Sequence, residues 1–157
     1  ELRGDLAGVY FKHFSKQKGY AYARAEDVGW DLLHRNVITF KKGFIRLPIK
    51  LPDKLSSLMI EIVRPSNRSA KSPSYPFDFI TCVTTADEVQ ALKEDEVLER
   101  ELGHFTIVEV KSGQSQLTQN EQEVCDKCKQ SGVRYRLFRI SEIEKAPASW
   151  DLLTEPE

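Results

Sequence analysis

The sequence has no long apolar run, few cysteines and no excess of either charge. No stretch of its 157 residues approaches the roughly 18 apolar residues of a membrane-spanning helix, so we expect no membrane association. Its three cysteines, Cys82, Cys125 and Cys128, lack the spacing of a disulfide framework, which favours a reducing, cytoplasmic or nuclear location. The formal net charge of −1 argues against a uniformly basic nucleic-acid binder.

We also expect no secretory leader, because the sequence starts at Glu1 rather than Met and shows no basic segment followed by an apolar one. This start is compatible with a fragment of a longer, multidomain protein. The composition, 40% hydrophobic and 30% charged, is that of a folded chain with a real core. We therefore expect a single domain over residues 1–157.

The charges are distributed unevenly along the chain. Between residues 41 and 71 there are eight cations against two acids, and between 87 and 101 there are seven acids against two cations. Such a molecule can present a basic face to phosphates although its average charge hides it, and two solvated surfaces are the alternative. The cations that we expect to contact nucleic acid are Lys41, Lys42, Arg46, Arg64, Arg68 and Lys71.

Apolar periodicity and turn residues predict an α/β chain. We expect helices over 2–18, 86–102 and 118–130, and strands over 20–23, 36–40, 44–47, 58–63, 77–83, 105–111 and 133–140. Residues 105–140 have the length of a strand–helix–strand unit with parallel strands. Residues 64–76, rich in proline, serine and cations, are expected to form a mobile loop, and residues 142–157 a polar tail.

One acid and one amine lie two residues apart at the end of an apolar strand. Side chains alternate along a strand, so Glu109 and Lys111 are expected on one face, with Val108 and Val110 on the other. A surface ion pair is the structural alternative.

A second carboxylate, Asp78, interrupts the apolar strand predicted over 77–83. A lone buried acid is costly unless it is paired or binds metal. If the two strands are neighbours, Asp78 and Glu109 can face one point. Together with the main-chain carbonyl of Val110 and waters, they would suit an octahedral Mg²⁺ or Mn²⁺ ion. Lys111 beside that ion would stabilise charge on a phosphate, so these parts suit phosphodiester hydrolysis.

Pro76-Phe77-Asp78 followed by Glu109-Val110-Lys111 resembles the PD-(D/E)XK nuclease superfamily, whose pattern is proline–acid, a gap, then acid–any–lysine. The continuation through Ser112 to Glu121 is similar to archaeal Holliday junction resolvase-related endonucleases. The resemblance covers about residues 75–140. It implies a restriction-endonuclease-like mixed central sheet flanked by helices, here with a basic Pro/Ser-rich insertion. It also implies a Mg²⁺-dependent endodeoxyribonuclease of DNA repair, recombination or restriction, with DNA as partner. Because cutting both strands usually requires two active sites, a homodimer is the assembly that such an activity favours.

The chain departs from that pattern in two places. Phe77 is inserted between Pro76 and Asp78, and the proline is not catalytic in the family. The gap between the acids is long and holds the acidic segment 86–102, where simpler resolvases of the family have a short hairpin.

Accessory residues follow from the same resemblance. A glutamine on the element after the lysine assists in related nucleases, so Gln119, Gln116 or Gln122 is a candidate, with a solvated helix face as the alternative. An acid on the first helix reaches the metal in related nucleases; Asp5 is a candidate here, and a helix N-terminal acid is the alternative. Ser112, beside the predicted site, could contact phosphate.

Two further interpretations remain open. Cys125 and Cys128 have the spacing of a metal or redox pair, but they lie on the apolar face of a predicted helix, which favours buried core thiols. The chain could also be a catalytically inactive nucleic-acid-binding module of the same fold, or a protein-interaction domain that uses its acidic segment.

Overall fold

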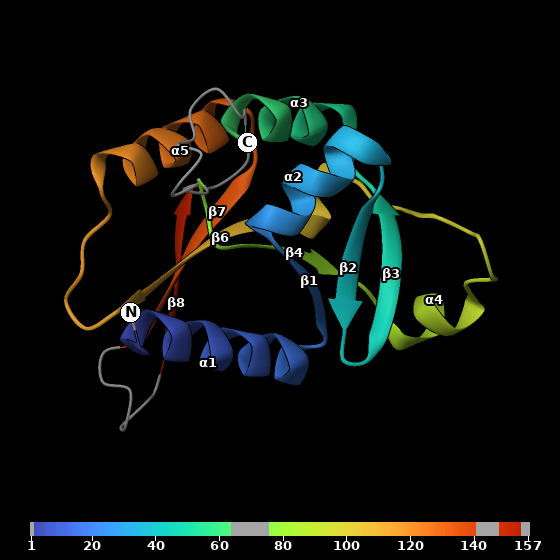
Figure 1. Ribbon diagram of the computed structural model, residues 1–157, viewed down its shortest axis with the longest axis horizontal. Helices are drawn as coiled ribbons and strands as arrows, with labels where there is room; N and C mark the ends of the chain where they lie inside the picture. Colours follow the sequence, from blue (N-terminus) through green and yellow to red (C-terminus); the bar gives the residue numbers. More distant parts are fainter. Residues whose placement is uncertain (1, 64–75, 141–147, 155–157) are drawn as a thin grey trace.

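The structure is a computed structural model that describes residues 2–63, 76–140 and 148–154, without the side chains of residues 2–5, 30, 32, 33 and 148. A central sheet is covered by one helix on one face and by three helices on the other (Figure 1). In chain order the elements are α1 (Leu2–Lys18), β1 (Tyr20–Arg24), α2 (Ala25–His34), β2 (Ile38–Lys42), β3 (Ile45–Lys50), α3 (Asp53–Ile62), β4 (Phe79–Val83), α4 (Ala86–Ala91), β5 (Leu98–Glu99), the 3-10 helix η2 (Leu102–His104), β6 (Phe105–Ser112), α5 (Gln119–Gln130), β7 (Arg134–Ile140) and β8 (Ala148–Thr154).

The sheet is mixed and has the strand order β5-β3-β2-β1-β4-β6-β7-β8. β4 and β6 are antiparallel neighbours, and β6 and β7 run parallel with α5 between them in sequence. The predicted strand–helix–strand unit is therefore confirmed. No helix within the described residues is long and apolar enough to cross a membrane.

Helix α1 packs across β1, β4, β6 and β7 through an aromatic cluster. Phe11 is fully buried, with ring centroids 4.7 Å from Phe79 and 5.1 Å from Phe138. Phe14 and Trp150 extend this cluster to β8. The helix ends at Gly19, whose φ of +75° favours glycine, as its position after a basic turn predicts.

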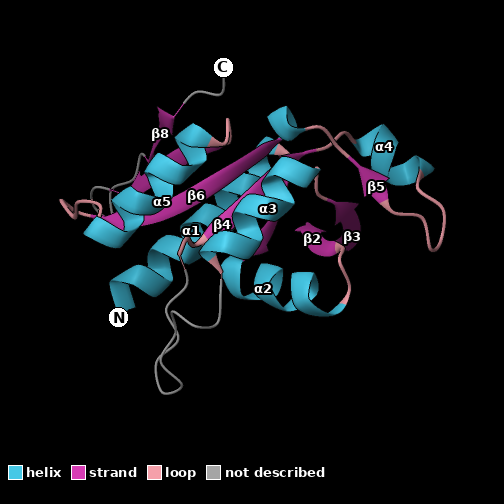
Figure 2. Cartoon of the chain, turned by 90° about the horizontal axis from the view of Figure 1, so that it is seen from above, coloured by secondary structure: helices cyan, strands magenta, loops and turns pink. Residues whose placement is uncertain are grey.

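Helices α2, α3 and α5 cover the opposite face and bury the larger core (Figure 2). Alternation along each strand supplies both cores: Phe105 and Ile107 of β6 face α5, whereas Val108 faces α1. Cys125 and Cys128 are buried and free within the larger core, which confirms their placement on the apolar face of α5.

Two predicted elements are wrong. Residues 58–63, predicted as a strand, belong mostly to α3, because Leu55, Leu58 and Met59 recur at helical spacing and are buried together. The helix predicted over 86–102 ends at Ala91. Since α4 buries no side chain, no apolar face supports a longer helix, and the chain turns at Asp95 into β5.

Outside the two segments described above, helix α2, strand β8 and the short η2 were not predicted. Helix α2 lies in a segment with mixed patterning, and β8 lies within the predicted polar tail. β8 is an edge strand that pairs only with β7, so its sequence carries little apolar alternation. The predicted loop at 64–76 lies outside the described residues except for Pro76.

Candidate functional site

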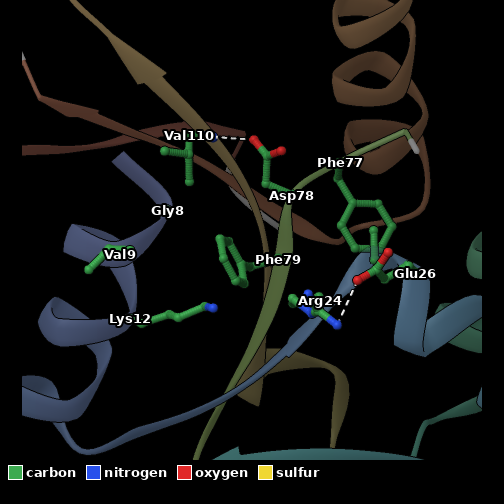
Figure 3. Close-up of a pocket in the computed structure, with 10 residues that line it drawn as sticks. Gly8, Val9, Lys12, Arg24, Glu26, Phe77, Asp78, Phe79 and Val110 are labelled. Carbon is green, nitrogen blue, oxygen red and sulfur yellow. Dashed lines mark hydrogen bonds and ion pairs between the residues drawn. The ribbon is translucent and has the colours of Figure 1, made fainter. Parts of the chain in front are cut away.

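Asp78 and Glu109 come together because β4 and β6 are neighbours. Asp78 immediately precedes β4, and its backbone N–H donates to the Val108 carbonyl at 3.1 Å. Its side-chain Oδ2 accepts from the backbone N–H of Val110 at 2.7 Å (Figure 3). These two bonds fix the Asp78 carboxyl beside the residue that follows Glu109, and the two carboxyl groups lie within hydrogen-bonding reach.

Lys111 lies on the same face of β6 as Glu109, as alternation predicts. Its Nζ is 2.7 Å from Oε1 of Glu121 on α5, and both side chains are largely shielded from solvent. Glu109 itself is 5% exposed. The predicted triad of Asp78, Glu109 and Lys111 is thus one contiguous cluster with Glu121 added.

Glu121 was not predicted as a site residue. The signal was present: Thr118 and Glu121 form a capping box, in which Oε1 of Glu121 accepts from the Thr118 N–H at 2.8 Å. In the folded protein this N3 side chain also lies against Lys111 at the end of β6. Sequence reasoning used this pair only to place the helix start.

The ionisation of the cluster is strongly perturbed. Burial raises the pKa of Glu109 to about 11, and the hydrogen bond with Glu121 and the charge of Asp78 add to this effect. Burial also raises the pKa of Asp78, against the opposing effect of the Val110 N–H. Burial raises the pKa of Glu121. Hydrogen bonds with Glu109, Lys111 and the Thr118 N–H outweigh this effect and lower the pKa to about 2. Near neutral pH the metal-free cluster therefore holds a proton on Glu109.

The acids fit a hard divalent cation by their chemistry. No N–H or O–H donor of the described residues reaches the buried Oε2 atom of Glu109, so this oxygen is left without a partner. A buried carboxylate oxygen without a donor is expensive, and a cation relieves that cost. Within the described part of the chain, no three His, Cys, Asp or Glu side chains are already arranged as a ligand shell.

A cavity of about 600 Å³ opens from Asp78 toward α1 (Figure 3). Lys12 of α1 and Arg24 of β1 line it. Arg24 forms an ion pair with Glu26, in which Nη2 lies 2.6 Å from Oε1. Gly8 and Val9 form its wall on α1, one turn after Asp5. The side chain of Asp5, predicted as an additional metal ligand, lies outside the described residues.

The predicted accessory residues do not contact the acids. The Gln119 side chain is exposed and hydrogen-bonds to no described residue, and Gln116 donates to the Gln114 carbonyl at 3.3 Å. Gln122 bonds to Asp126 on the exposed side of α5. Ser112 ends β6 on the α1 side of the sheet, opposite Lys111.

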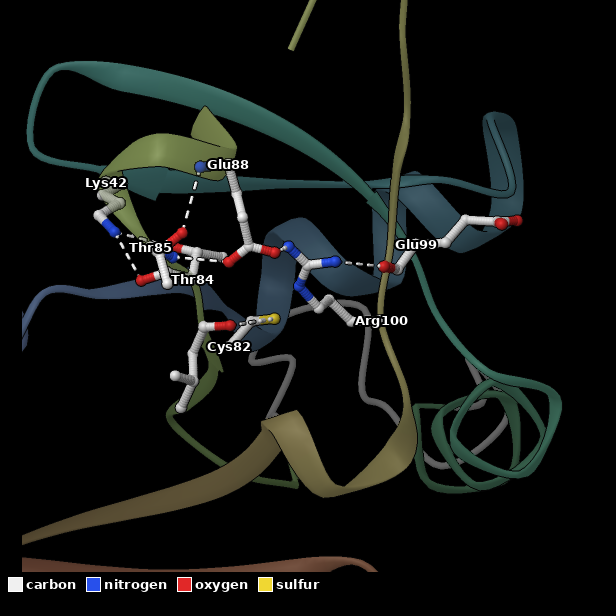
Figure 4. A network of polar contacts seen from close by, with 8 residues as sticks. Lys42, Cys82, Thr84, Thr85, Glu88, Glu99 and Arg100 are labelled. Carbon is white, nitrogen blue, oxygen red and sulfur yellow. Dashed lines mark hydrogen bonds and ion pairs between the residues drawn. The ribbon is translucent and has the colours of Figure 1, made fainter. Parts of the chain in front are cut away.

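The three predicted phosphate-contacting cations that the structure describes do not form one surface. Lys41 and Arg46 are paired in register on the α1 side of β2 and β3, and both are exposed. Lys42 faces the other way and donates to the carbonyl and hydroxyl oxygens of Thr84 at 2.8 and 2.9 Å, beside an acidic network in which Glu88 pairs with Arg100 (Figure 4). Three further predicted cations lie outside the described residues: Arg64, Arg68 and Lys71.

Comparisons of this chain with family models, with curated proteins and with solved structures find no match.

Proposed function

We propose that this protein is a metal-dependent endonuclease that hydrolyses phosphodiester bonds of DNA. The observation that carries the proposal is the convergence of Asp78, Glu109 and Lys111 at the ends of two adjacent strands, with Glu109 and Lys111 on one face. Two carboxylates and a lysine around one point are the groups that metal-assisted phosphodiester hydrolysis needs.

Each residue has a distinct role in this proposal. Asp78, Glu109 and the Val110 carbonyl would hold Mg²⁺ or Mn²⁺, which supplies Lewis acidity and an activated water when bound. Glu109 must lose its proton to serve as a ligand. Lys111 places an ammonium where negative charge builds on the phosphate in the transition state, and Glu121 orients that ammonium.

The substrate-binding surface that we propose is the open part of the sheet beside α1. It meets the site at Asp78 and Val110, which line its cavity, whereas Glu109 and Lys111 lie on the other face of β6 at the same end of the strand. The 600 Å³ cavity continues into hollows of about 150 and 390 Å³, which share Arg24 with it. Lys12, Lys41 and Arg46 line these hollows and form no ion pair with any described residue. Phe44, fully exposed at the β2–β3 turn, adds a ring on which an unpaired base can stack.

Cleavage assays test the proposal directly. We expect the protein to cut at least one of a panel of branched, duplex and single-stranded DNAs when Mg²⁺ or Mn²⁺ is present, and chelator or Asp78→Asn to abolish the cutting. Partial rescue of Asp78→Asn by higher Mn²⁺ would indicate weakened metal binding. DNA binding without cleavage under every condition would favour the inactive binding module, and neither binding nor cleavage would refute both.

The proposed surface makes a separate prediction about salt. Replacing Lys12, Lys41 and Arg46 together with glutamine should lower the slope of log affinity against log salt by about 0.7–0.9 for each phosphate that is no longer neutralised. Fluorescence anisotropy over a salt series measures this slope. The matched control neutralises Lys54, Lys127 and Lys129 on the opposite helical layer and should leave the slope unchanged. Equal slopes for both triple variants would show that the three cations are only a solvated surface.

A further inference from the structure

A second polar cavity lies at the other end of β6 and β7. It has a volume of about 320 Å³, and its lining residues are Tyr20, Thr81, Val83, Thr106, Arg134, Arg136, Trp150 and Leu152. Thr81, Thr106 and Arg134 are register partners across β4, β6 and β7, so one row of polar side chains forms its floor. This floor faces the α1 side of the sheet, whereas Glu109 and Lys111 lie near the carboxyl end of β6 on the other face.

The cavity is positively charged and contains no carboxylate among its lining residues. Neither Arg134 nor Arg136 forms an ion pair with a described residue. Each guanidinium is instead aimed by a backbone carbonyl: Arg134 donates to Gly103 at 2.9 Å, and Arg136 donates to Trp150 at 3.1 Å. Asp151, adjacent to Trp150, points to the opposite face of β8. Both arginines therefore keep donors free for a ligand.

The hydroxyl groups of the floor are also unused. Thr81 is 3% and Thr106 is 7% exposed, yet neither hydroxyl bonds to a described residue. The guanidinium carbon of Arg136 lies 5.1 Å from the centroid of the Trp150 ring, and this cation–π contact favours its position over the ring. Burial lowers the pKa of Arg136, and the charge of Arg134 adds to this effect, against the opposing influence of Tyr20 and Asp151.

From this geometry we infer a binding site for a phosphomonoester group. Two fixed guanidinium groups and two hydroxyl donors match the several terminal oxygens and the double negative charge of such a group. The aromatic faces of Trp150 are occupied by Arg136 and by the α1 cluster, so the phosphate rather than a stacked base is recognised. The group can belong to a free nucleotide or to the phosphorylated end of a nucleic-acid strand.

The site is tested independently of cleavage by titrating phosphate ligands into the protein in the presence of chelator and recording proton–nitrogen correlation NMR spectra at each step. The Asp78→Asn chain is used so that DNA stays intact under the proposed function. We expect millimolar inorganic phosphate, but not acetate, to shift the signals of Thr81, Thr106, Arg134 and the Trp150 indole. Tighter binding of a DNA strand carrying a 5′-phosphate than of its 5′-hydroxyl counterpart and of adenosine monophosphate would identify the strand end. Binding of the nucleotide at least as tight as that of the strand would identify a small-molecule ligand.

Variants locate the binding. Arg134→Gln and Arg136→Gln should each weaken phosphate binding about tenfold or more, and Thr106→Val, which keeps the side-chain volume, should weaken it by a smaller factor. Arg139→Gln is the matched control, because Arg139 lies on the opposite face of β7 and also donates to a carbonyl, that of Gly113. Folding of each variant is checked by thermal unfolding. The inference fails if no phosphate ligand shifts these signals, if acetate shifts them equally, or if Arg139→Gln weakens binding as much as Arg134→Gln.

Discussion

Replacing Lys111 with alanine is expected to slow DNA cleavage by about 10²–10³-fold and to leave DNA affinity nearly unchanged. The ammonium stabilises charge that develops only as the phosphate reacts, so its loss lowers the rate rather than the binding. Single-turnover cleavage and a gel-shift assay on the same preparation separate the two quantities.

The control for this variant is Lys127→Ala. Lys127 lies on α5, the helix that carries Glu121, the ion-pair partner of Lys111. Lys127 is paired with Glu61 at 3.3 Å on the surface, remote from the acids, and its loss should leave the cleavage rate unchanged. Normal cleavage by Lys111→Ala would mean that Lys111 is only the partner of Glu121. The enzymatic proposal would then lose its strongest support.

Glu109→Gln is expected to abolish cleavage and at the same time to stabilise the metal-free protein above neutral pH. In the native state the pKa of Glu109 is about 11, whereas an unfolded glutamate has a value near 4.5. Between these values the native state keeps a proton that the unfolded state releases, so stability falls as pH rises through this window. One such proton corresponds to at most about 1.4 kcal/mol per pH unit.

Glutamine removes this dependence without removing the donor. Its amide group supplies N–H donors, one of which can replace the single O–H of the protonated carboxyl in the hydrogen bond with Glu121. Urea unfolding in chelator at several pH values should therefore give a flatter stability profile for Glu109→Gln than for the parent protein. Glu121 acts in a separate window: its lowered pKa contributes stability that is lost only as pH falls below about 4.5 toward 2.

Added Mn²⁺ provides the second readout. The parent protein should gain stability as the metal binds the native state, and Glu109→Gln should gain little. Glu61→Gln, an exposed substitution on α3, is the control and should resemble the parent in both measurements. A parent stability profile that does not fall between pH 6 and pH 8 would contradict the buried, protonated state of Glu109.

Much of the sheet and the shared face of Glu109 and Lys111 could be predicted from the sequence because the relevant signals are local. Alternation in residues 105–111 set Glu109 and Lys111 on one face, and the capping box at Thr118 fixed the start of α5. The glycine after a basic turn marked the end of α1. Each of these signals depends on neighbours within a few residues, so the sequence alone determined them.

Other features depended on contacts between distant segments. Only strand order made β4 and β6 neighbours, and only the packing of α5 over the sheet brought Glu121 to Lys111. Residues 58–63 combine β-branched and long apolar side chains that suit a strand or a helix. The helical conformation of this segment is stabilised because it buries Leu55, Leu58 and Met59 against α2 and α5. The same kind of pairing across β4, β6 and β7 assembled the arginine cavity from residues that are scattered along the sequence.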